Sequence, residues 1–324
     1  MTFLSILCAL LIEQLRPLRA DNPVYLAVSH LAARMETWFN AGEANQGRLA
    51  WVLMMLALML PVALIYWLCV RVSPFAALAW NIVIVYLTLG FRHYSHYFTS
   101  IQLSLSAGDE NAARAMLAEW TGEDTAGFDL RDIARKAVET ALVTTHRNVF
   151  GVFFWFLMPV GPACAVMYRV AEHLAQSWNA PTRKGSGDFG RFAATAFYWI
   201  DWIPARLTAT AFAVVGNFED AIYAWRNFAH RWHDEAIGII LASGGGAMGL
   251  RLGEAGEGAA DLPVSEAAVI NADGTVEVPL AEPEVLPGEE ATARALQSTV
   301  GLVWRALLLW MLLLLLLSIA VWLG

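Results

Sequence analysis

Charged residues and closely spaced cysteines are scarce in this sequence. Only 15% of its 324 residues are charged, whereas an average soluble domain has about 25%. The three cysteines lie far apart along the chain and each sits in an apolar stretch, which argues against a disulfide framework or a cysteine-based metal site. Clustered positive charge of the kind that binds nucleic acid is also missing. We therefore expect no resident metal and no nucleic-acid partner.

Hydrophobic residues are abundant instead. They make up 58% of the chain, and the mean hydropathy is +0.50. A membrane-spanning helix needs about 20 apolar residues. The clearest candidates for spans are residues 49–70, 75–91, 149–168 and 303–323, and weaker, partial or interfacial candidates are residues 2–15 and 203–217. The sequence predicts an all-α, polytopic integral membrane protein with about five membrane segments, located in the bacterial inner membrane.

The polar stretch 92–148 carries strong helix signals. Asp109 precedes an alanine-rich run and is a suitable N-terminal cap, and Asp129 is a second one. After Asp129, the apolar residues recur on one helical face: Ile133, Ala134, Ala137, Val138, Ala141 and Leu142. These signals predict a helical hairpin packed at the membrane.

Basic residues around this hairpin place it in the cytoplasm by the positive-inside rule; they are Arg92, Arg131, Arg135, Lys136 and Arg147. A simple crossing by residues 149–168 would then export the basic residues that follow. Pro159, Gly161 and Pro162 lie close together inside that segment, which favours a break or a re-entrant turn. Both topologies stay open after residue 150.

The net charge of −8 comes from one late segment. The stretch from Glu254 to Glu290 holds ten of the 29 acidic residues and none of the 21 Lys and Arg residues. Its Gly, Pro and Ala content predicts a flexible insert, with a short hairpin turning at residues 272–274. The chain thus divides into 1–91 (N-terminal membrane segments), 92–148 (cytoplasmic helices), 149–252 (membrane and interfacial core with the PARL and GLRLG motifs), 253–298 (acidic insert) and 299–324 (C-terminal transmembrane helix).

Four stretches together resemble a known family: residues 103–140, 153–169 (FFWFLMPVGPACAVMYR), 189–209 (FGRFAATAFYWIDWIPARLTA) and 242–254 (ASGGGAMGLRLGE). Their order and spacing are similar to those of the CobD/CbiB family. That family comprises polytopic membrane proteins that act as adenosylcobinamide-phosphate synthases. The resemblance implies ATP-dependent amide ligation, which joins an amino alcohol phosphate to a side chain of a cobyric acid. It covers residues 1–254 and 295–324, with the acidic insert outside it.

Several positions depart from the family pattern. Where the family has Arg-Asp-Thr in the polar region, this chain has Glu123, Asp124 and Thr125, so a negative charge replaces a positive one. The acids and the amide that end the following family helix correspond to Val143, Thr144 and Arg147, and the paired aspartates and the asparagine before the IPARL motif correspond to Phe197, Tyr198 and Asp201. Phosphoryl chemistry usually needs Mg²⁺ held by carboxylates. Carboxylates that suit Mg²⁺ are thus missing here.

Six polar residues are predicted to contact a ligand: Asp124, Glu139, Arg169, Asp201, Arg206 and Arg251. No catalytic residue is assigned. Asp201 and Arg206 lie five positions apart around a proline in an oily run, and charge in such a run usually has a partner or a task. The alternative is an interfacial pair, or an arginine that reaches the lipid headgroups. Glu139 could instead bridge to Arg135 on the same helix face.

The glycine-rich stretch SGGGAMG lacks the lysine and the spacing of a phosphate-binding P-loop. Its glycines could admit an anion to the backbone or could serve tight packing. Two histidine pairs, His93 with His96 and His230 with His233, have helical spacing but no third ligand nearby, so interfacial polar contacts are the preferred interpretation.

Three functions remain open on these grounds. The first is a cobalamin-related membrane protein of the CobD/CbiB family with ligase-type activity that is altered or lost; ATP and Mg²⁺ would be cofactors only if that activity is kept. The second is a non-catalytic signalling modulator that resembles AmpE, a protein of β-lactamase induction and cell-wall stress, particularly in HRNVFGVFFWF and IDWIPARL. The third is a scaffold whose acidic insert recruits a protein. The expected partners are the lipid bilayer and a corrinoid precursor or another small anion.

Overall fold

The computed structural model describes residues 2–16, 22–40, 44–180, 188–253, 269–270, 276–277 and 288–323. The α-helices in this part of the chain are α1 (Thr2–Leu15), α2 (Pro23–Phe39), α3 (Ala44–Val72), α4 (Pro74–Thr88), α5 (Phe91–Ser106), α6 (Glu110–Thr121), α7 (Leu130–Thr145), α8 (Gly151–Phe156), α9 (Gly161–Trp178), α10 (Arg191–Val215), α11 (Phe218–Phe228), α12 (Glu235–Met248) and α13 (Ala293–Leu323). A π-helix, η1 (His146–Phe150), joins α7 to α8, and a short 3₁₀ helix, η2 (Ala229–Arg231), follows α11. The two strands are β1 (Val269–Ile270) and β2 (Val276–Glu277).

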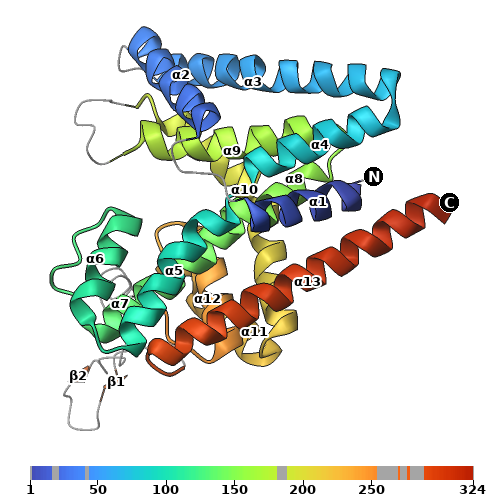
Figure 1. Cartoon of the computed structure of the whole chain (residues 1–324). Helices are drawn as coiled ribbons and strands as arrows, with labels where there is room; N and C mark the ends of the chain where they lie inside the picture. Colours follow the sequence, from blue (N-terminus) through green and yellow to red (C-terminus); the bar gives the residue numbers. More distant parts are fainter. Residues whose placement is uncertain are drawn as a thin grey trace.

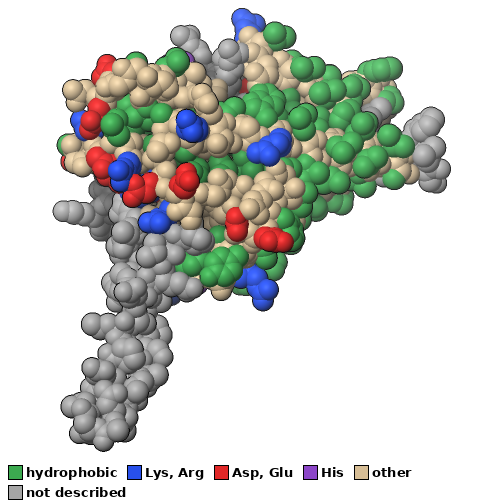
Figure 2. All heavy atoms as spheres, turned by 90° about the horizontal axis from the view of Figure 1, so that it is seen from below, with side chains coloured by type: hydrophobic (Ala, Val, Ile, Leu, Met, Phe, Trp, Pro, Cys, Tyr) green, Lys and Arg blue, Asp and Glu red, His purple; other side chains and the backbone are tan. Residues whose placement is uncertain are grey.

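The helices separate the molecule into a polar end and an apolar end. In Figure 1, α6 and α7 lie at one end, whereas the turn between α3 and α4 and the C-terminal end of α13 reach toward the other. Helices α9, α10 and α12 lie between these ends; α10 packs against α9, α12 and α13. Figure 2 shows charged side chains gathered toward one end and hydrophobic ones covering the other.

The all-helical prediction is confirmed apart from the two short strands, but the predicted spans differ in the structure. Only α3 and α13, among the described helices, are long and apolar enough to cross a membrane. The predicted span 75–91 is the 15-residue helix α4, which at 1.5 Å per residue is about 22 Å long. The predicted span 149–168 breaks at residues 157–160, where α8 ends and α9 folds back against it. The proline and glycine residues there explain the break.

Local signals placed the helices of the polar end correctly. Asp109 caps α6 through a bond from Ala112 N at 3.0 Å. Asp129 caps α7 in a reciprocal capping box with Asp132. All six residues of the predicted apolar face of α7 are buried. Sequence reasoning did not separate α5 from the hairpin that α6 and α7 form.

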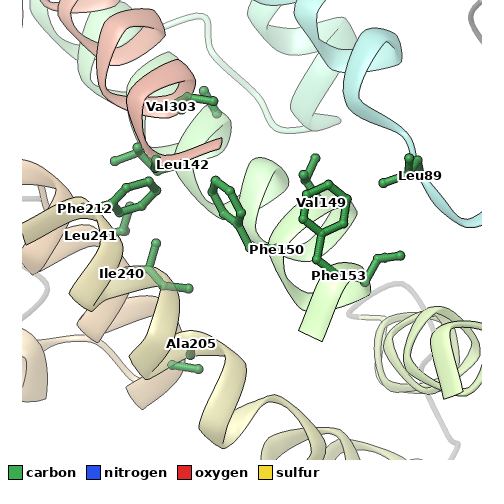
Figure 3. Close-up of a cluster of buried hydrophobic side chains, with 14 of the residues drawn as sticks. Leu89, Leu142, Val149, Phe150, Phe153, Ala205, Phe212, Ile240, Leu241 and Val303 are labelled. Atoms are coloured by element: carbon green, nitrogen blue, oxygen red, sulfur yellow. The ribbon is translucent and has the colours of Figure 1, made fainter. Parts of the chain in front are cut away.

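An aromatic residue of the π-helix η1 lies at the centre of the core. Phe150 is fully buried, with its ring 6.0 Å from the ring of Phe212 on α10 and 6.0 Å from that of Trp310 on α13. Figure 3 shows Phe150 between Phe212 and Val149, with Leu142 and Val303 close to Phe212. Because one side chain touches helices that are distant in sequence, η1 ties the N-terminal half of the chain to the C-terminal half.

The glycines of α12 serve close packing. A Cβ atom on Gly246 would lie 2.5 Å from the backbone oxygen of Asp220, and one on Gly244 would lie 2.8 Å from a side-chain carbon of Leu142. Both glycines are buried. Of the two interpretations of this stretch, tight packing is therefore the one that the structure supports.

The two ends of the acidic insert are fastened together. Arg251 N donates to Glu289 O at 2.8 Å and Glu289 N donates to Gly249 O at 2.8 Å. Gly249 has a φ of +69°, the left-handed conformation that favours glycine at the end of a helix. Inside the insert, β1 and β2 pair antiparallel as predicted, while the predicted turn residues and most of residues 254–287 lie outside the described residues.

The backbone bonds between residues 249–251 and 289 predict that the insert can be excised. Replacing residues 254–287 with a linker of about six Gly and Ser residues should leave the unfolding temperature of the purified protein unchanged, because the bonds between residues 249–251 and 289 already hold the junction. Circular dichroism in detergent during heating measures this. A fall of several degrees would mean that the insert contributes to the core.

Candidate functional site

A cleft of about 210 Å³ opens where α9, α10, η1 and the start of α12 meet. Its lining residues are Arg147, Ala175, Gln176, Ala194, Phe197, Tyr198, Asp201, Asp234 and Ala236. The cleft is smaller than the 300–1,000 Å³ that is typical for drug-sized ligands. A volume of this size suits a small polar group.

Asp201 forms the polar floor of this cleft and is only 2% exposed. Its Oδ1 lies 2.9 Å from His146 Nε2 and accepts a hydrogen bond from Tyr168 Oη at 2.8 Å. His146 Nδ1 lies 2.8 Å from Thr208 Oγ1. Because a carboxylate only accepts, Nε2 carries the imidazole proton, and in neutral His146 the Thr208 hydroxyl donates to Nδ1. The buried carboxylate is thus held by residues of η1 and α9.

Three local features position this network. The π-helix η1 sends His146 into the interior while the next residue, Arg147, lines the cleft. Gly151 leaves room for the Tyr168 ring, since a Cβ atom there would lie 2.2 Å from Tyr168 Oη. Pro204 has no N–H to donate to the carbonyl of Ile200 four residues earlier. That carbonyl accepts a bond from Trp155 Nε1 at 3.2 Å instead.

The cleft carries charges of both signs. Arg147 Nη2 lies 3.8 Å from Asp234 Oδ2, and the guanidinium of Arg147 sits 5.7 Å from the centre of the Phe197 ring. Burial by itself raises the pKa of Asp201, but the charge and hydrogen bond of His146, the charge of Arg147 and the hydroxyl of Tyr168 together lower that pKa below its usual value. Asp201 is therefore a carboxylate at neutral pH.

Tyr198, which lines the cleft, connects it to a second polar group formed by Glu235 and Arg206. Tyr198 Oη donates to Glu235 Oε2 at 2.5 Å, and Glu235 also forms an ion pair with Arg206. The hydrogen bond from Tyr198 is the main cause that lowers the pKa of Glu235; partial burial opposes it and Arg206 reinforces it. The same bond raises the pKa of the Tyr198 phenol. Arg206 also stacks over the Trp202 ring at 3.8 Å.

The structure brings together some of the six predicted ligand contacts and not others. Asp201 lines the cleft. Arg206 reaches the cleft residue Tyr198 only through Glu235. Arg169 forms an ion pair with Glu172, whose other oxygen lies 3.4 Å from the amide of the cleft residue Gln176.

The other three predicted ligand contacts, Asp124, Glu139 and Arg251, lie outside this cleft. Glu139 accepts a bond from Gly253 N at 2.7 Å and lies 3.5 Å from Arg135, so it fastens α7 to the chain after α12. Arg251 donates to Gly288 O at the base of the insert. Asp124 accepts from Ala126 N within its own turn. These residues stabilise the fold at the polar end.

Sequence reasoning missed several residues of the site. His146, Tyr168 and Asp234 were not considered as site residues, and Arg147 was interpreted as a topology anchor. A usable signal was present: His146 and Arg147 are adjacent polar residues immediately before an apolar run, and a buried polar residue in such a run needs a partner.

Thr208, His146 and Asp201 have the connectivity of a hydrolase triad, but the geometry excludes that role. Thr208 and His146 are both 0% exposed. A nucleophile must reach the reacting atom of its substrate, and the hydroxyl of Thr208 is sealed within the helical core. The network orients Asp201 and does not perform nucleophilic attack.

Protein donors already take one oxygen of each cleft carboxylate, which makes the cleft a poor match for a carboxylate-held divalent cation. Asp201 is bound by His146 and Tyr168, and Asp234 Oδ1 accepts from Ala236 N and Ile237 N as the cap of α12. The guanidinium of Arg147 repels a cation in this cleft, whereas the carboxylates of Asp201 and Asp234 attract one. Within the described part of the chain, no group of three or more His, Cys, Asp or Glu side chains is placed to hold a metal ion.

Comparison with known proteins identifies the relatives of this chain. The family model described as CobD/Cbib protein matches residues 6–272. The chain belongs to the CobD/CbiB family. It is 31% identical over 319 residues to the cobalamin biosynthesis protein CobD of Stutzerimonas stutzeri, which spans 97% of both chains. It is 30% identical over 196 residues to the CobD protein of Chromobacterium violaceum, which covers 60% of this chain and 62% of that one.

The family-model match differs from the predicted coverage, because it does not include residues 295–324. It continues to residue 272, so the first part of the acidic insert is not outside it as expected. No solved structure matches the chain. Similarity to AmpE is not shown by these comparisons.

Four of the residues that depart from the family pattern, as the resemblance gives it, line the cleft. Arg147, which corresponds to a family acid, lines it, and so do Phe197 and Tyr198, which correspond to the paired aspartates. Asp201, in place of the family asparagine, forms its floor. At three positions where the resemblance implies carboxylates, the cleft thus presents a guanidinium and two aromatic rings.

The site predicts that Gly151→Ala is strongly destabilising. The added methyl group would displace the Tyr168 ring from Asp201, and overpacking of this kind typically costs about 1–3 kcal/mol. Thermal unfolding of the purified protein measures the loss. Gly301→Ala on α13 is the matched control because a Cβ atom there meets nothing within 4 Å; equal stability of the two variants would contradict the positioning role of Gly151.

Proposed function

We propose that this chain is a multi-pass inner-membrane protein of cobalamin biosynthesis that binds a small phosphorylated amino alcohol in its cleft. We further propose that the ATP-dependent amide ligation of the family is lost in it. The observation that carries the proposal is the pair of opposite charges in the cleft, with the guanidinium of Arg147 and the carboxylates of Asp201 and Asp234.

A zwitterionic ligand matches this arrangement. Guanidinium groups bind phosphate through paired hydrogen bonds. Carboxylates and aromatic rings favour an ammonium group, and Asp201 lies beside Phe197 and Tyr198 in the cleft lining. A phosphate joined to a short amino alcohol fits a cleft of about 210 Å³. The resemblance to the family supplies the same ligand class, since its synthases join an amino alcohol phosphate to a corrinoid.

The residues that line the cleft are the reason for proposing that ligation is lost. ATP-driven amide formation places several phosphate charges close together and normally balances them with carboxylate-bound Mg²⁺. One oxygen of each cleft carboxylate is already engaged by protein donors, and Arg147 repels a cation. Binding is retained in this proposal, and phosphoryl chemistry is not.

Helices α3 and α13 support the membrane part of the proposal. At 29 residues, α3 is about 43 Å long, more than the roughly 30 Å hydrocarbon core of a bilayer. Only 11% of its apolar window is buried, and the corresponding share for α13 is 33%. Large apolar residues are exposed on α3, including Leu56, Leu60, Leu64 and Leu68. Apolar surface of this extent is favourable in lipid and unfavourable in water.

Cysteine labelling tests this topology. In a variant without the three native cysteines, Ser73→Cys between α3 and α4 should react with a membrane-impermeant maleimide in intact spheroplasts. Gly127→Cys, in the exposed turn before α7, should react only after lysis, because the hairpin of α6 and α7 is cytoplasmic. Equal labelling of both sites in intact spheroplasts, or release of the protein by alkaline carbonate, would contradict the proposal.

Ligand binding and complementation test the function. Titration calorimetry of the full-length protein in detergent should show saturable binding of O-phosphoethanolamine. Arg147→Gln should weaken it at least tenfold, since hydrogen bonds to charged groups contribute about 1.5–3 kcal/mol. Arg226→Gln on α11 is the matched control because Arg226 does not line the cleft.

The same chain should fail to restore corrinoid-dependent growth in a strain that lacks its cobinamide-phosphate synthase, even with the protein verified in the membrane. Restored growth would overturn the loss of ligation. Absence of saturable binding by the unaltered protein would overturn the proposed ligand.

A further inference from the structure

Arg147 and Asp234 face each other across the cleft without a direct hydrogen bond. Their charged atoms are 3.8 Å apart, whereas a charge-assisted hydrogen bond is about 2.7–2.9 Å long. Arg147 is held among buried groups with 17% of its side chain exposed, but Asp234 is 43% exposed. The arginine is thus anchored beside the Phe197 ring, and its carboxylate partner is the part that contacts solvent.

Asp234 also caps α12, and this role does not involve Arg147. Its Oδ1 accepts bonds from Ala236 N at 2.9 Å and Ile237 N at 3.3 Å, and so caps α12. Only Oδ2 approaches Arg147. Asp234 can therefore lose the ion pair and still hold the start of α12 in place, which leaves the guanidinium available to another anion.

We infer that the cleft binds its phosphate group without a divalent cation, and that Arg147 exchanges the Asp234 carboxylate for the phosphate. This inference rests on the proposed ligand of the cleft and adds the means of its recognition. The phosphate makes short, paired bonds to the guanidinium that Asp234 does not make. The guanidinium supplies the positive charge that a carboxylate-held Mg²⁺ ion would otherwise supply, at a position where the family pattern has an acid.

Metal dependence tests the inference. The full-length protein is titrated in detergent with O-phosphoethanolamine, and separately with inorganic phosphate, in an excess of EDTA and then in an excess of MgCl₂. The expected dissociation constants agree within about twofold, because no metal ion takes part. Binding that is at least tenfold weaker in EDTA and is restored by MgCl₂ would overturn the inference and leave the proposed ligand in place.

Removal of the competing carboxylate provides an independent measurement. Asp234→Asn keeps the cap of α12, since Asn and Asp cap about equally well, but it removes the negative charge that occupies Arg147. Phosphate binding should become about two- to fivefold tighter, the range for release of one partly exposed ion pair. Glu219→Gln, in the first turn of α11 and outside the cleft lining, is the matched control and should leave binding unchanged.

Two other outcomes decide against the exchange. Unchanged or weaker binding in Asp234→Asn, with an unfolding temperature equal to that of the unaltered protein, would show that Asp234 does not compete for Arg147. No binding of either probe under any condition would overturn this inference together with the proposed ligand.

Discussion

Burial of the Asp201 carboxylate is the constraint on which the arrangement of the site depends. A buried charge without partners costs several kcal/mol, so the chain must bring hydrogen-bond donors to it. His146 and Tyr168 do this from η1 and α9. Because both donors are themselves fully buried, η1, α9 and α10 have little freedom to shift against one another. Residues of these three helices line the cleft, so their fixed positions determine its shape.

The same constraint accounts for local irregularities in the backbone. The π-helix η1 places His146 toward Asp201 and Arg147 toward the cleft, and it also centres Phe150 in the core. Gly151 admits the Tyr168 ring. The free carbonyl of Ile200, created by Pro204, accepts the indole N–H of Trp155. Each irregularity in these helices is therefore satisfied by a specific contact near the site.

The charges of the cleft underlie the proposal that this member of the CobD/CbiB family binds a phosphate without ligating it. The cleft has carboxylates, but protein donors take one oxygen of each, and the guanidinium of Arg147 lies beside them. An arginine binds phosphate as a fixed, permanently charged group. It does not supply the open coordination positions that make a metal ion useful in phosphoryl transfer. A cleft of this kind is suited to holding a phosphate and less suited to activating one.

The sequence by itself determined the features that depend on near neighbours. These include the capped starts of α6 and α7, the buried face of α7, the break near Pro159, the β-hairpin and the expectation that Asp201 has a polar partner. The tertiary structure decided which side chains meet. His146, Tyr168 and Thr208 join one network across separations of 33 to 62 residues. Helical periodicity reports which face of a helix is apolar but not which helix will cover it, so these partners, the cleft and the separate positions of Glu139 and Arg251 emerged only from the packing of the helices.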